Sequence, residues 1–124
     1  MNLLIVDDYP SNRKLLRAAL EAEGHEVVEA TNGREALRML EQELADAVIS
    51  DVLMPTMDGF RLCQEIRKRE TLSGVPLILY TSTYNSPADR ELARSVGADA
   101  YILKPAPVGV LLNAVGEAQR QART

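Results

Sequence analysis

The feature that most constrains this chain is a regular alternation of short apolar runs with helical patterns. The runs are rich in β-branched and aliphatic residues and are continuous, which is typical of strands buried on both faces of a sheet. They lie at residues 3–6, 27–30, 47–50, 77–80 and 101–103. This alternation of strand and helix predicts one parallel sheet with helices on both faces, joined by right-handed crossovers.

Between the runs, apolar residues recur with the spacing of one helix face. The five stripes are Leu15, Leu16, Ala19 and Leu20; Ala36, Leu37, Leu40 and Leu44; Phe60, Cys63 and Ile66; Leu92, Ala93 and Val96; and Leu111, Leu112 and Val115. Residues typical of helix ends agree with these stripes. They are Pro10, Asn32 with Glu35 (similar to a capping box), and Ser86 with Pro87 at the beginnings, and Gly24 and Gly97 at the ends.

The length of 124 residues suits one domain, which we expect over residues 1–120, with a polar tail or the start of a linker over 119–124. The apolar runs are far shorter than the roughly 20 residues that cross a bilayer, so we expect no membrane segment and interpret the first run as a strand. A single cysteine, Cys63, excludes an internal disulfide, is predicted to lie in the core, and fits a cytoplasmic protein. The net charge of −4 argues against nucleic acid as a direct partner.

The fold class that these patterns favour is α/β, a flavodoxin-like (βα)5 doubly wound parallel sheet with strand order 2-1-3-4-5. In such sheets the functional crevice lies beyond the carboxyl ends of the strands. The polar residues at those ends are Asp7 and Asp8 after the first strand, Asp51 after the third, Thr81 after the fourth and Lys104 after the fifth. We therefore expect these side chains to converge at one edge of the sheet.

Three carboxylates at one edge repel one another unless a cation lies between them. Oxygen ligands without histidine or cysteine favour Mg²⁺, with Mn²⁺ as a possible substitute. Lys104 and the Thr81 hydroxyl would lie opposite the metal and could bind the oxygens of a phosphoryl group, with Asp51 as the carboxylate nucleophile. Taken singly, each residue has a simpler interpretation, such as an acidic helix start or a turn residue. Their joint placement favours a site.

With these residues identified, the sequence resembles the receiver (CheY-like) domain of two-component response regulators over essentially its whole length. The matching segments are residues 4–8 (LIVDD), 51–59 (DVLMPTMDG), Thr81-Ser82, Gly97-Ala98 and 101–105 (YILKP). The resemblance implies that Asp51 accepts a phosphoryl group from a histidine kinase or a histidine phosphotransfer protein. It also implies that Asp7, Asp8, Asp51 and the backbone carbonyl of Leu53 bind Mg²⁺.

The resemblance further implies a switch rather than an enzyme that acts on other molecules: the domain would catalyse only its own phosphorylation and dephosphorylation. Thr81 and Lys104 would bind the phosphoryl oxygens, and Tyr101 would change position on activation. We expect the surface formed by the fourth helix, fifth strand and fifth helix to bind an output partner or a second copy of the chain.

Several positions depart from the usual receiver pattern. Ser82 follows the switch threonine where most receivers have Ala or Gly, and it is small enough to admit a phosphoryl group. Ala106 stands where an aromatic often follows the Lys-Pro pair, which predicts a fifth helix that is seated less firmly. Leu53 and Thr83, which flank the reaction, are not the strongly polar pair of fast-dephosphorylating members.

Three other functions are weaker fits. A haloacid-dehalogenase-like aspartyl phosphatase requires a second acid two residues after a nucleophile on the first strand, but Tyr9 follows Asp7 at that distance. A flavodoxin requires a phosphate-binding loop after the first strand, where this chain has acids that would repel the phosphate. An interaction module that is never phosphorylated would not need the complete set of acids, threonine and lysine. The sequence leaves open whether the domain acts alone or belongs to a longer regulator or hybrid kinase.

Overall fold

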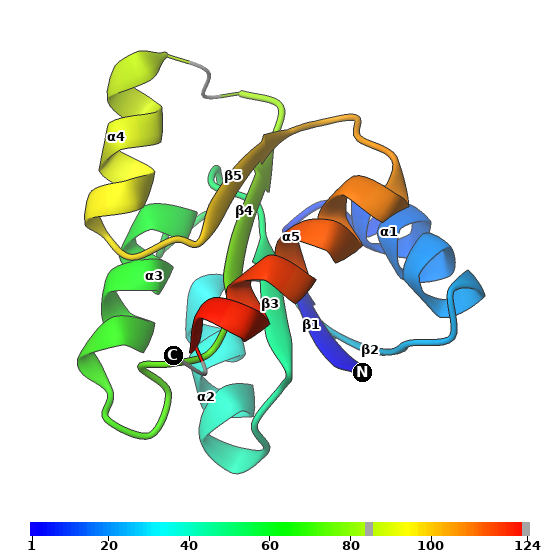
Figure 1. The fold of residues 1–124 in the computed structure, drawn as a ribbon, viewed down its shortest axis with the longest axis horizontal. Helices are drawn as coiled ribbons and strands as arrows, with labels where there is room; N and C mark the ends of the chain where they lie inside the picture. The colour runs from blue at the N-terminus through cyan, green and yellow to red at the C-terminus, as the bar shows by residue number, and fades with distance from the viewer. Residues whose placement is uncertain (84–85, 123–124) are drawn as a thin grey trace.

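The computed structural model describes residues 1–83 and 86–122, and these form five strands and five helices in strict alternation (Figure 1). In chain order they are β1 (Asn2–Val6), α1 (Pro10–Ala22), β2 (Glu26–Ala30), α2 (Gly33–Gln42), β3 (Ala47–Ser50), α3 (Gly59–Lys68), β4 (Leu77–Thr81), α4 (Pro87–Ser95), β5 (Ala100–Leu103) and α5 (Val108–Ala122). Residues 119–122 of the predicted tail continue α5, and the last two residues of that tail lie outside the described part. No described helix is both long and apolar enough to cross a membrane.

The strands form one parallel sheet in the order β2-β1-β3-β4-β5, which confirms the predicted flavodoxin-like fold. The register aligns the carboxyl ends of neighbouring strands. Val6 of β1 lies opposite Ser50 of β3, Ser50 lies opposite Leu79 of β4, and Thr81 lies opposite Leu103 of β5. Residues that directly follow these strands are therefore brought to the same edge of the sheet.

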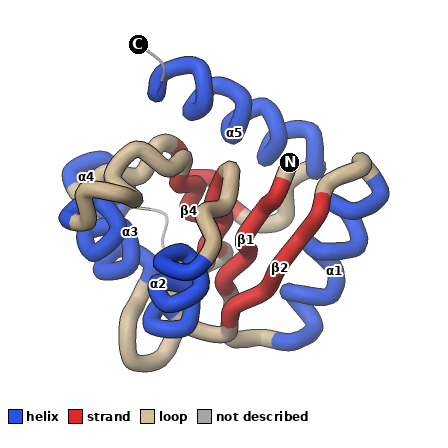
Figure 2. The backbone as a smooth tube through the Cα atoms, turned by 90° about the horizontal axis from the view of Figure 1, so that it is seen from below, coloured by secondary structure: helices blue, strands red, loops and turns tan. Residues whose placement is uncertain are grey.

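Helices cover both faces of the sheet (Figure 2). α1 and α5 pack on one face, and α2, α3 and α4 pack on the other. Every residue of the inner strands β3 and β4 is buried, as their continuous apolar runs predicted. The prediction of burial on both faces is wrong for the edge strands, because each has a strand neighbour on one side only: Val28 in β2 is 49% exposed, and every residue of β5 is half-buried.

Three leucines of the predicted helical stripes are exposed rather than packed, namely Leu15 (75%), Leu44 (58%) and Leu92 (44%). Leu15 borders an open groove between α1 and α5, whereas Leu20 is the fully buried core residue of α1. Leu44 follows the end of α2 and so does not share its buried face. In α4 the core contact is made by Ala93. Cys63, in contrast, is fully buried in α3 as predicted, and burial raises the pKa of its thiol to about 12.

The N-terminal caps of α2 and α4 lie where the sequence predicted them, but the capping box is at α4 and not at α2. The Asn32 side chain accepts a hydrogen bond from the Glu35 amide at 2.9 Å, as expected for an N-cap. The Glu35 carboxylate accepts from the amide of Thr31 and not from that of Asn32, so the predicted capping box is not complete. A complete capping box is found instead at α4, between Ser86 and Asp89.

Glycine ends two helices as predicted, because the residue after the helix has a positive φ. Gly24 follows α1 with φ +87°, and Gly97 follows α4 with φ +95°. Gly97 is also closely packed, since a Cβ there would lie 2.7 Å from Cγ of Arg67. The Arg67 guanidinium donates to the Gly97 carbonyl at 2.9 Å and to the Asp99 carboxylate at 3.0 Å. The turn between α4 and β5 is thereby attached to α3.

The loop from β3 to α3 returns closely to its own start. The amide of Gly59 donates to the Val52 carbonyl at 2.8 Å. A Cβ at Gly59 would overlap the carbonyl oxygen of Asp51 and lie 2.9 Å from Cα of Val52. Thr56, inside the loop, has a left-handed backbone with φ 66°. Gly59 therefore allows the first turn of α3 to contact the backbone of Asp51 directly.

Replacing this glycine should disturb both the fold and the position of Asp51. We expect Gly59→Ala to lower the free energy of unfolding by about 2 kcal/mol, because backbone atoms must move to admit the methyl group. Urea unfolding followed by circular dichroism measures the change. Gly109→Ala, near the start of α5, is the matched control, because its Cβ would have no atom within 4 Å. A Gly59→Ala protein as stable as the control would show that this contact is not required.

Candidate functional site

The carboxyl ends of β1, β3, β4 and β5 bring the predicted site residues to one edge of the sheet. Asp7 and Asp51 directly follow β1 and β3, and they are only 6% and 9% exposed. The Asp51 amide donates to the carbonyl of Val6 at 2.9 Å, which continues the pairing of the two strands. Likewise the Lys104 amide donates to the Thr81 carbonyl at 2.9 Å, which places Lys104 directly beside the end of β4.

The ammonium group of Lys104 lies between two buried carboxylates. Its Nζ donates to Oδ2 of Asp7 at 2.8 Å and to Oδ2 of Asp51 at 3.3 Å. Burial by itself lowers the pKa of Lys104, but the hydrogen bond to Asp7 and the negative charges of Asp51 and Asp7 outweigh it and raise this pKa above the ordinary 10.5. Lys104 is therefore charged at neutral pH and supplies the counter-charge for both acids.

The second oxygen of each buried carboxylate is bound by a backbone amide. Oδ1 of Asp7 accepts from the amide of Tyr9 at 2.9 Å. Oδ1 of Asp51 accepts from the amide of Val52 at 2.7 Å. Each carboxylate thus has a hydrogen bond to both oxygens, which fixes its orientation in the crevice.

Asp8 differs from the other two acids. It is half-buried, and within the described residues its Oδ1 is buried without a hydrogen-bond partner. Across residues 1–83 and 86–122, no three acidic, histidine or cysteine side chains form a group that could hold a metal ion as they stand. The structure thus brings Asp7, Asp51 and Lys104 together, with the lysine between the two buried acids. The oxygen-only ligands and the unpartnered oxygen of Asp8 still fit the chemistry of a hard cation.

The two predicted switch residues lie on neighbouring strands. Thr81 is fully buried, and its hydroxyl oxygen accepts from the amide of Thr83 at 3.3 Å. Tyr101, in β5, is half-buried and packs against the core on the side of α2, α3 and α4. The guanidinium of Arg90 lies 5.3 Å from the centre of its ring. Leu53, the predicted carbonyl ligand, has a side chain that is half exposed.

Two residues around the site were not identified from the sequence. Arg13 of α1 donates to the backbone carbonyl of Asp7 at 2.7 Å and to Glu29 at 3.2 Å, so it attaches the helix to the start of the crevice. Tyr80, next to Thr81 in β4, accepts a hydrogen bond from the amide of Ala106 at 2.9 Å. The small residue at position 106 was noted as a departure, but the sequence does not show that a tyrosine elsewhere contacts it.

Comparison with known proteins identifies the family. Residues 3–116 match the model of the response regulator receiver domain. A probable transcriptional regulator, ycf27, of Guillardia theta is 47% identical over 103 residues, which make up 83% of this chain and 39% of that protein. The chain thus spans about two fifths of the length of the curated relatives that it matches first.

Two solved structures agree with this result. The signal receiver domain of a signal transduction histidine kinase from Syntrophus aciditrophicus has a TM-score of 0.86 and 37% identity, over 97% of this chain and 90% of that one. The receiver domain of the sensor histidine kinase PA1611 from Pseudomonas aeruginosa has a TM-score of 0.85 and 30% identity, over 95% and 96% of the two chains. In that structure a magnesium ion is coordinated in the active site cleft.

The five-stranded parallel sheet with a buried acid and lysine at its carboxyl edge defines a CheY-like signalling domain. The chain belongs to the response regulator receiver domain family of two-component systems. Domains of this family act as signalling switches rather than as enzymes that turn over a separate substrate.

Removing the lysine should destabilise the protein in a pH-dependent way. We expect Lys104→Met to lower the free energy of unfolding by about 2 kcal/mol at neutral pH in metal-free buffer, because two buried acids lose their counter-charge. The pKa of Lys104 is raised in the folded protein, so its contribution is complete below the ordinary value of 10.5 and disappears as the pH rises through the folded-state pKa. Urea unfolding at a series of pH values measures this difference. Lys14→Met, on the exposed face of α1, is the control, and equal stability of both variants at neutral pH would contradict the expectation.

Proposed function

We propose that this domain is a cytoplasmic phosphoacceptor switch in which Asp51 receives a phosphoryl group from the phosphohistidine of a kinase or a histidine phosphotransfer protein. The observation that carries the proposal is the Asp51 carboxylate, which lies almost buried at the edge of the sheet beside a charged lysine and a second acid. A carboxylate fixed by hydrogen bonds and flanked by cations is a suitable nucleophile for phosphoryl transfer.

The transfer exchanges one bond at phosphorus for another. An oxygen of Asp51 forms the new P–O bond while the P–N bond to the donor histidine breaks, and the imidazole leaves with the bonding electrons. The ammonium of Lys104 already lies 3.3 Å from Oδ2 of Asp51, so it needs only a small movement to bind a phosphoryl oxygen. The hydroxyl of Thr81 accepts from the Thr83 amide and keeps its own proton, which it can donate to a second phosphoryl oxygen.

We propose that Asp7, Asp8, Asp51 and the backbone carbonyl of Leu53 hold Mg²⁺, for which Mn²⁺ can substitute. When bound, the ion neutralises the carboxylates and the charge that develops on the phosphoryl oxygens. Among the described residues Oδ1 of Asp8 has no hydrogen-bond partner, which supports this assignment, because a buried carboxylate oxygen without a donor is costly unless a cation binds it. Lys104 would then shift from Asp7 toward the phosphoryl group.

The phosphoacceptor can be tested with a small donor. We expect acetyl phosphate with Mg²⁺ to add one phosphoryl group to the wild-type protein and none to Asp51→Asn, because the nucleophile is then lost. Intact-mass spectrometry reads out the addition. Asp58→Asn is a matched control on the same loop, because Asn can also accept the cap hydrogen bond that Asp58 accepts from the Arg61 amide at 2.8 Å. Labelling of Asp51→Asn to the same extent as the control would rule out this phosphoacceptor.

We further propose that the signal leaves the site through Thr81 and Tyr101. A phosphoryl group that accepts a hydrogen bond from Thr81 would draw its side chain toward Asp51 and free space next to β5, where Tyr101 is large enough to fill it. Arg90 of α4 contacts Tyr101 twice, with its guanidinium over the ring and with a hydrogen bond of 3.4 Å to the carbonyl. A movement of Tyr101 would therefore reach the surface formed by α4, β5 and α5, which we propose binds the output partner or a second copy.

This route predicts a separation of phosphorylation from transmission. Beryllofluoride, which mimics the phosphoryl group, should change amide chemical shifts in the Asp51 loop and in α4 and β5 of the wild type. In Thr81→Ala the changes should stay in the Asp51 loop, because the nucleophile remains but the coupling hydroxyl is gone. Thr83→Ala is the control, since its contact with Thr81 uses the backbone amide that alanine keeps. Wild-type α4 and β5 amides that do not respond to beryllofluoride would eliminate the route.

A further inference from the structure

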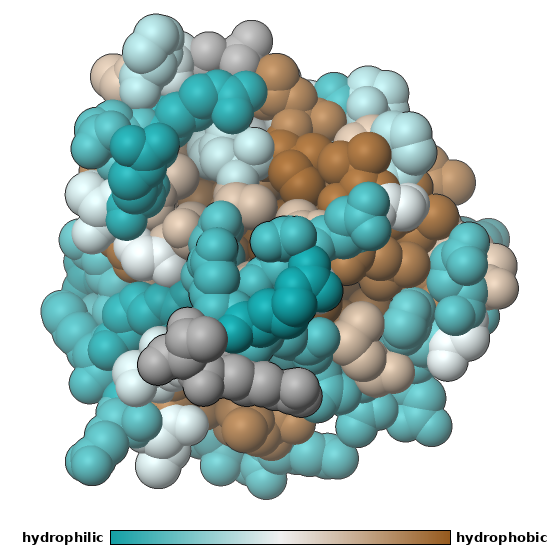
Figure 3. Space-filling view, in the orientation of Figure 1, coloured by the Kyte–Doolittle hydropathy of each residue, from teal (hydrophilic) through white to brown (hydrophobic). Residues whose placement is uncertain are grey.

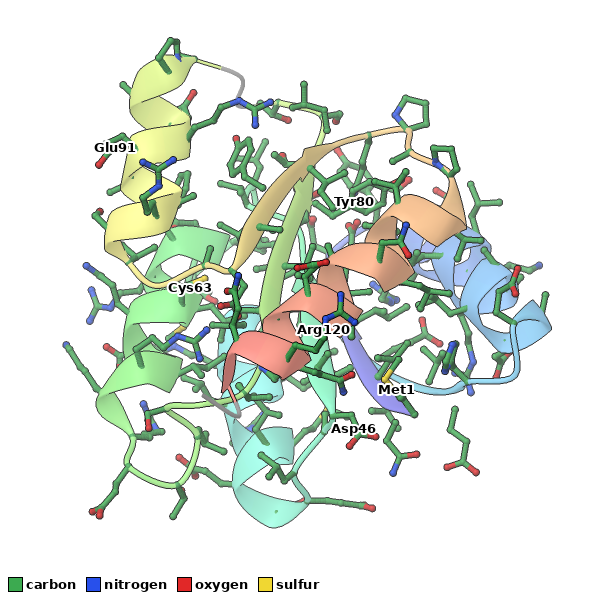
Figure 4. The ribbon with its side chains drawn as sticks, in the orientation of Figure 1. Met1, Asp46, Cys63, Tyr80, Glu91 and Arg120 are labelled. Atoms are coloured by element: carbon green, nitrogen blue, oxygen red, sulfur yellow. The ribbon has the colours of Figure 1, made fainter. Side chains whose placement is uncertain are left out.

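Tyr80 contacts the segment that carries Lys104 in two ways. Its ring lies under the ammonium group, with Nζ of Lys104 5.4 Å from the ring centre. Its hydroxyl accepts from the amide of Ala106 at 2.9 Å and lies 3.4 Å from the Ala106 carbonyl, to which it can donate. Figure 4 labels Tyr80 near the chain that leads from β5 into α5, and the residue is only 9% exposed. One side chain therefore contacts both the charge of Lys104 and the backbone two residues later.

These contacts attach the end of β5 to β4 at two points. At the first point, the backbone amide of Lys104 donates to the carbonyl of Thr81 at 2.9 Å. At the second point, the Tyr80 hydroxyl binds the backbone of Ala106. The two attachments come from adjacent residues of β4 and flank the Lys104-Pro105 pair. The lysine backbone is thus fixed on both sides by β4.

Tyr80 places an aromatic ring beside Lys104, whereas the residue that follows the Lys104-Pro105 pair is small. Ala106 contributes only a methyl group, and a groove of about 400 Å³ lies beside it between α1 and α5. Apolar residues that line this groove include Leu15, Leu16, Ala106 and Leu111, and Tyr80 and Lys104 line it as well, together with the polar residues Asp7, Asn12 and Ser82. Figure 3 shows apolar side chains gathered on the surface over this part of the molecule. The small side chain of Ala106 and the large one of Tyr80 are therefore complementary: Tyr80 supplies the aromatic ring next to Lys104, and its hydroxyl binds the backbone of Ala106.

We propose that Tyr80 is a positioning residue for phosphoryl transfer: its ring orients the Lys104 ammonium and its hydroxyl fixes the turn that follows. The proposal rests on the proposed roles of Asp51 and Lys104. A cation over the face of an aromatic ring is attracted by the ring quadrupole, which favours one position of the flexible lysine side chain. A lysine that is held near the reacting oxygens has only a small movement to make, so it loses little freedom when the phosphoryl group arrives.

A core residue without this role would give a different result. Loss of the Tyr80 hydroxyl would then lower stability, but it would slow phosphorylation equally whether or not Lys104 is present. A positioning role through Lys104 requires the two effects to depend on each other, and a double-mutant cycle measures this dependence. Tyr80→Phe keeps the ring and removes the hydroxyl, whereas Tyr80→Leu removes both.

The test compares initial rates of labelling by acetyl phosphate and Mg²⁺, followed by intact mass, in the full chain. We expect Tyr80→Phe to slow labelling about threefold and Tyr80→Leu about tenfold, as one and then two positioning contacts are lost. In the Lys104→Met background, where Asp51 remains as nucleophile, Tyr80→Phe should cause no further slowing. Ser73→Ala, which removes an exposed hydroxyl before the start of β4, at the opposite end of the sheet from the crevice, should label at the wild-type rate.

Thermal unfolding of each variant separates positioning from folding, since Tyr80→Phe should lower the melting temperature to a similar extent in both backgrounds. A Tyr80→Phe protein that labels at the wild-type rate, or that is slowed equally with and without Lys104, would overturn the positioning role while leaving the proposed function intact. A wild-type protein that is not labelled at all would overturn the proposed function, and this inference with it.

Discussion

The contact on which the site depends is the ammonium of Lys104 between the carboxylates of Asp7 and Asp51. Two acids that are almost fully buried in a small domain require a counter-charge, because an isolated buried carboxylate is very costly. The lysine supplies it from the far side of the site, and in doing so it joins the ends of β1, β3 and β5. The register of the parallel sheet makes this possible, since it brings residues from positions 7 to 104 to one edge.

Most of the fold could be predicted because its determinants are local and repeated. The apolar runs locate the strands, and the residue that follows each run locates the edge of the sheet. The partial exposure of the two edge strands could not be predicted in this way. The apolar runs of β2 and β5 resemble those of the central strands, and only the order of strands in the folded sheet places them at its edges, where Val28 is exposed. The exposure of Leu15 in α1 could not be predicted either. The helical spacing gives the apolar face of the helix, but not which residue at the margin of that face is covered by another element.

The shared edge of Asp7, Asp51, Thr81 and Lys104 could be predicted from the sequence, but the contacts among these residues could not. Position after a strand placed Lys104 at the correct edge, yet it could not show that the lysine bridges two acids while, among the described residues, Oδ1 of Asp8 has no hydrogen-bond partner. Such pairings depend on side-chain conformation and on competition among several possible counter-charges. Tyr80 is a stronger example, because its contacts with Lys104 and Ala106 join residues about 25 positions away that only the packed sheet brings together.

The guanidinium of Arg67 joins several elements at the end of the sheet opposite the site, where β4 and β5 begin. It binds the turn between α4 and β5 at Gly97 and Asp99, and the Asp99 carboxylate also accepts from the amide of Leu77 at the start of β4. The beginnings of β4 and β5 and the end of α4 are therefore joined to α3 at one point. If α4 rotated, this point would be its pivot, and the displacement would be smallest at Gly97 and largest at the first turn of the helix, roughly 13 Å away.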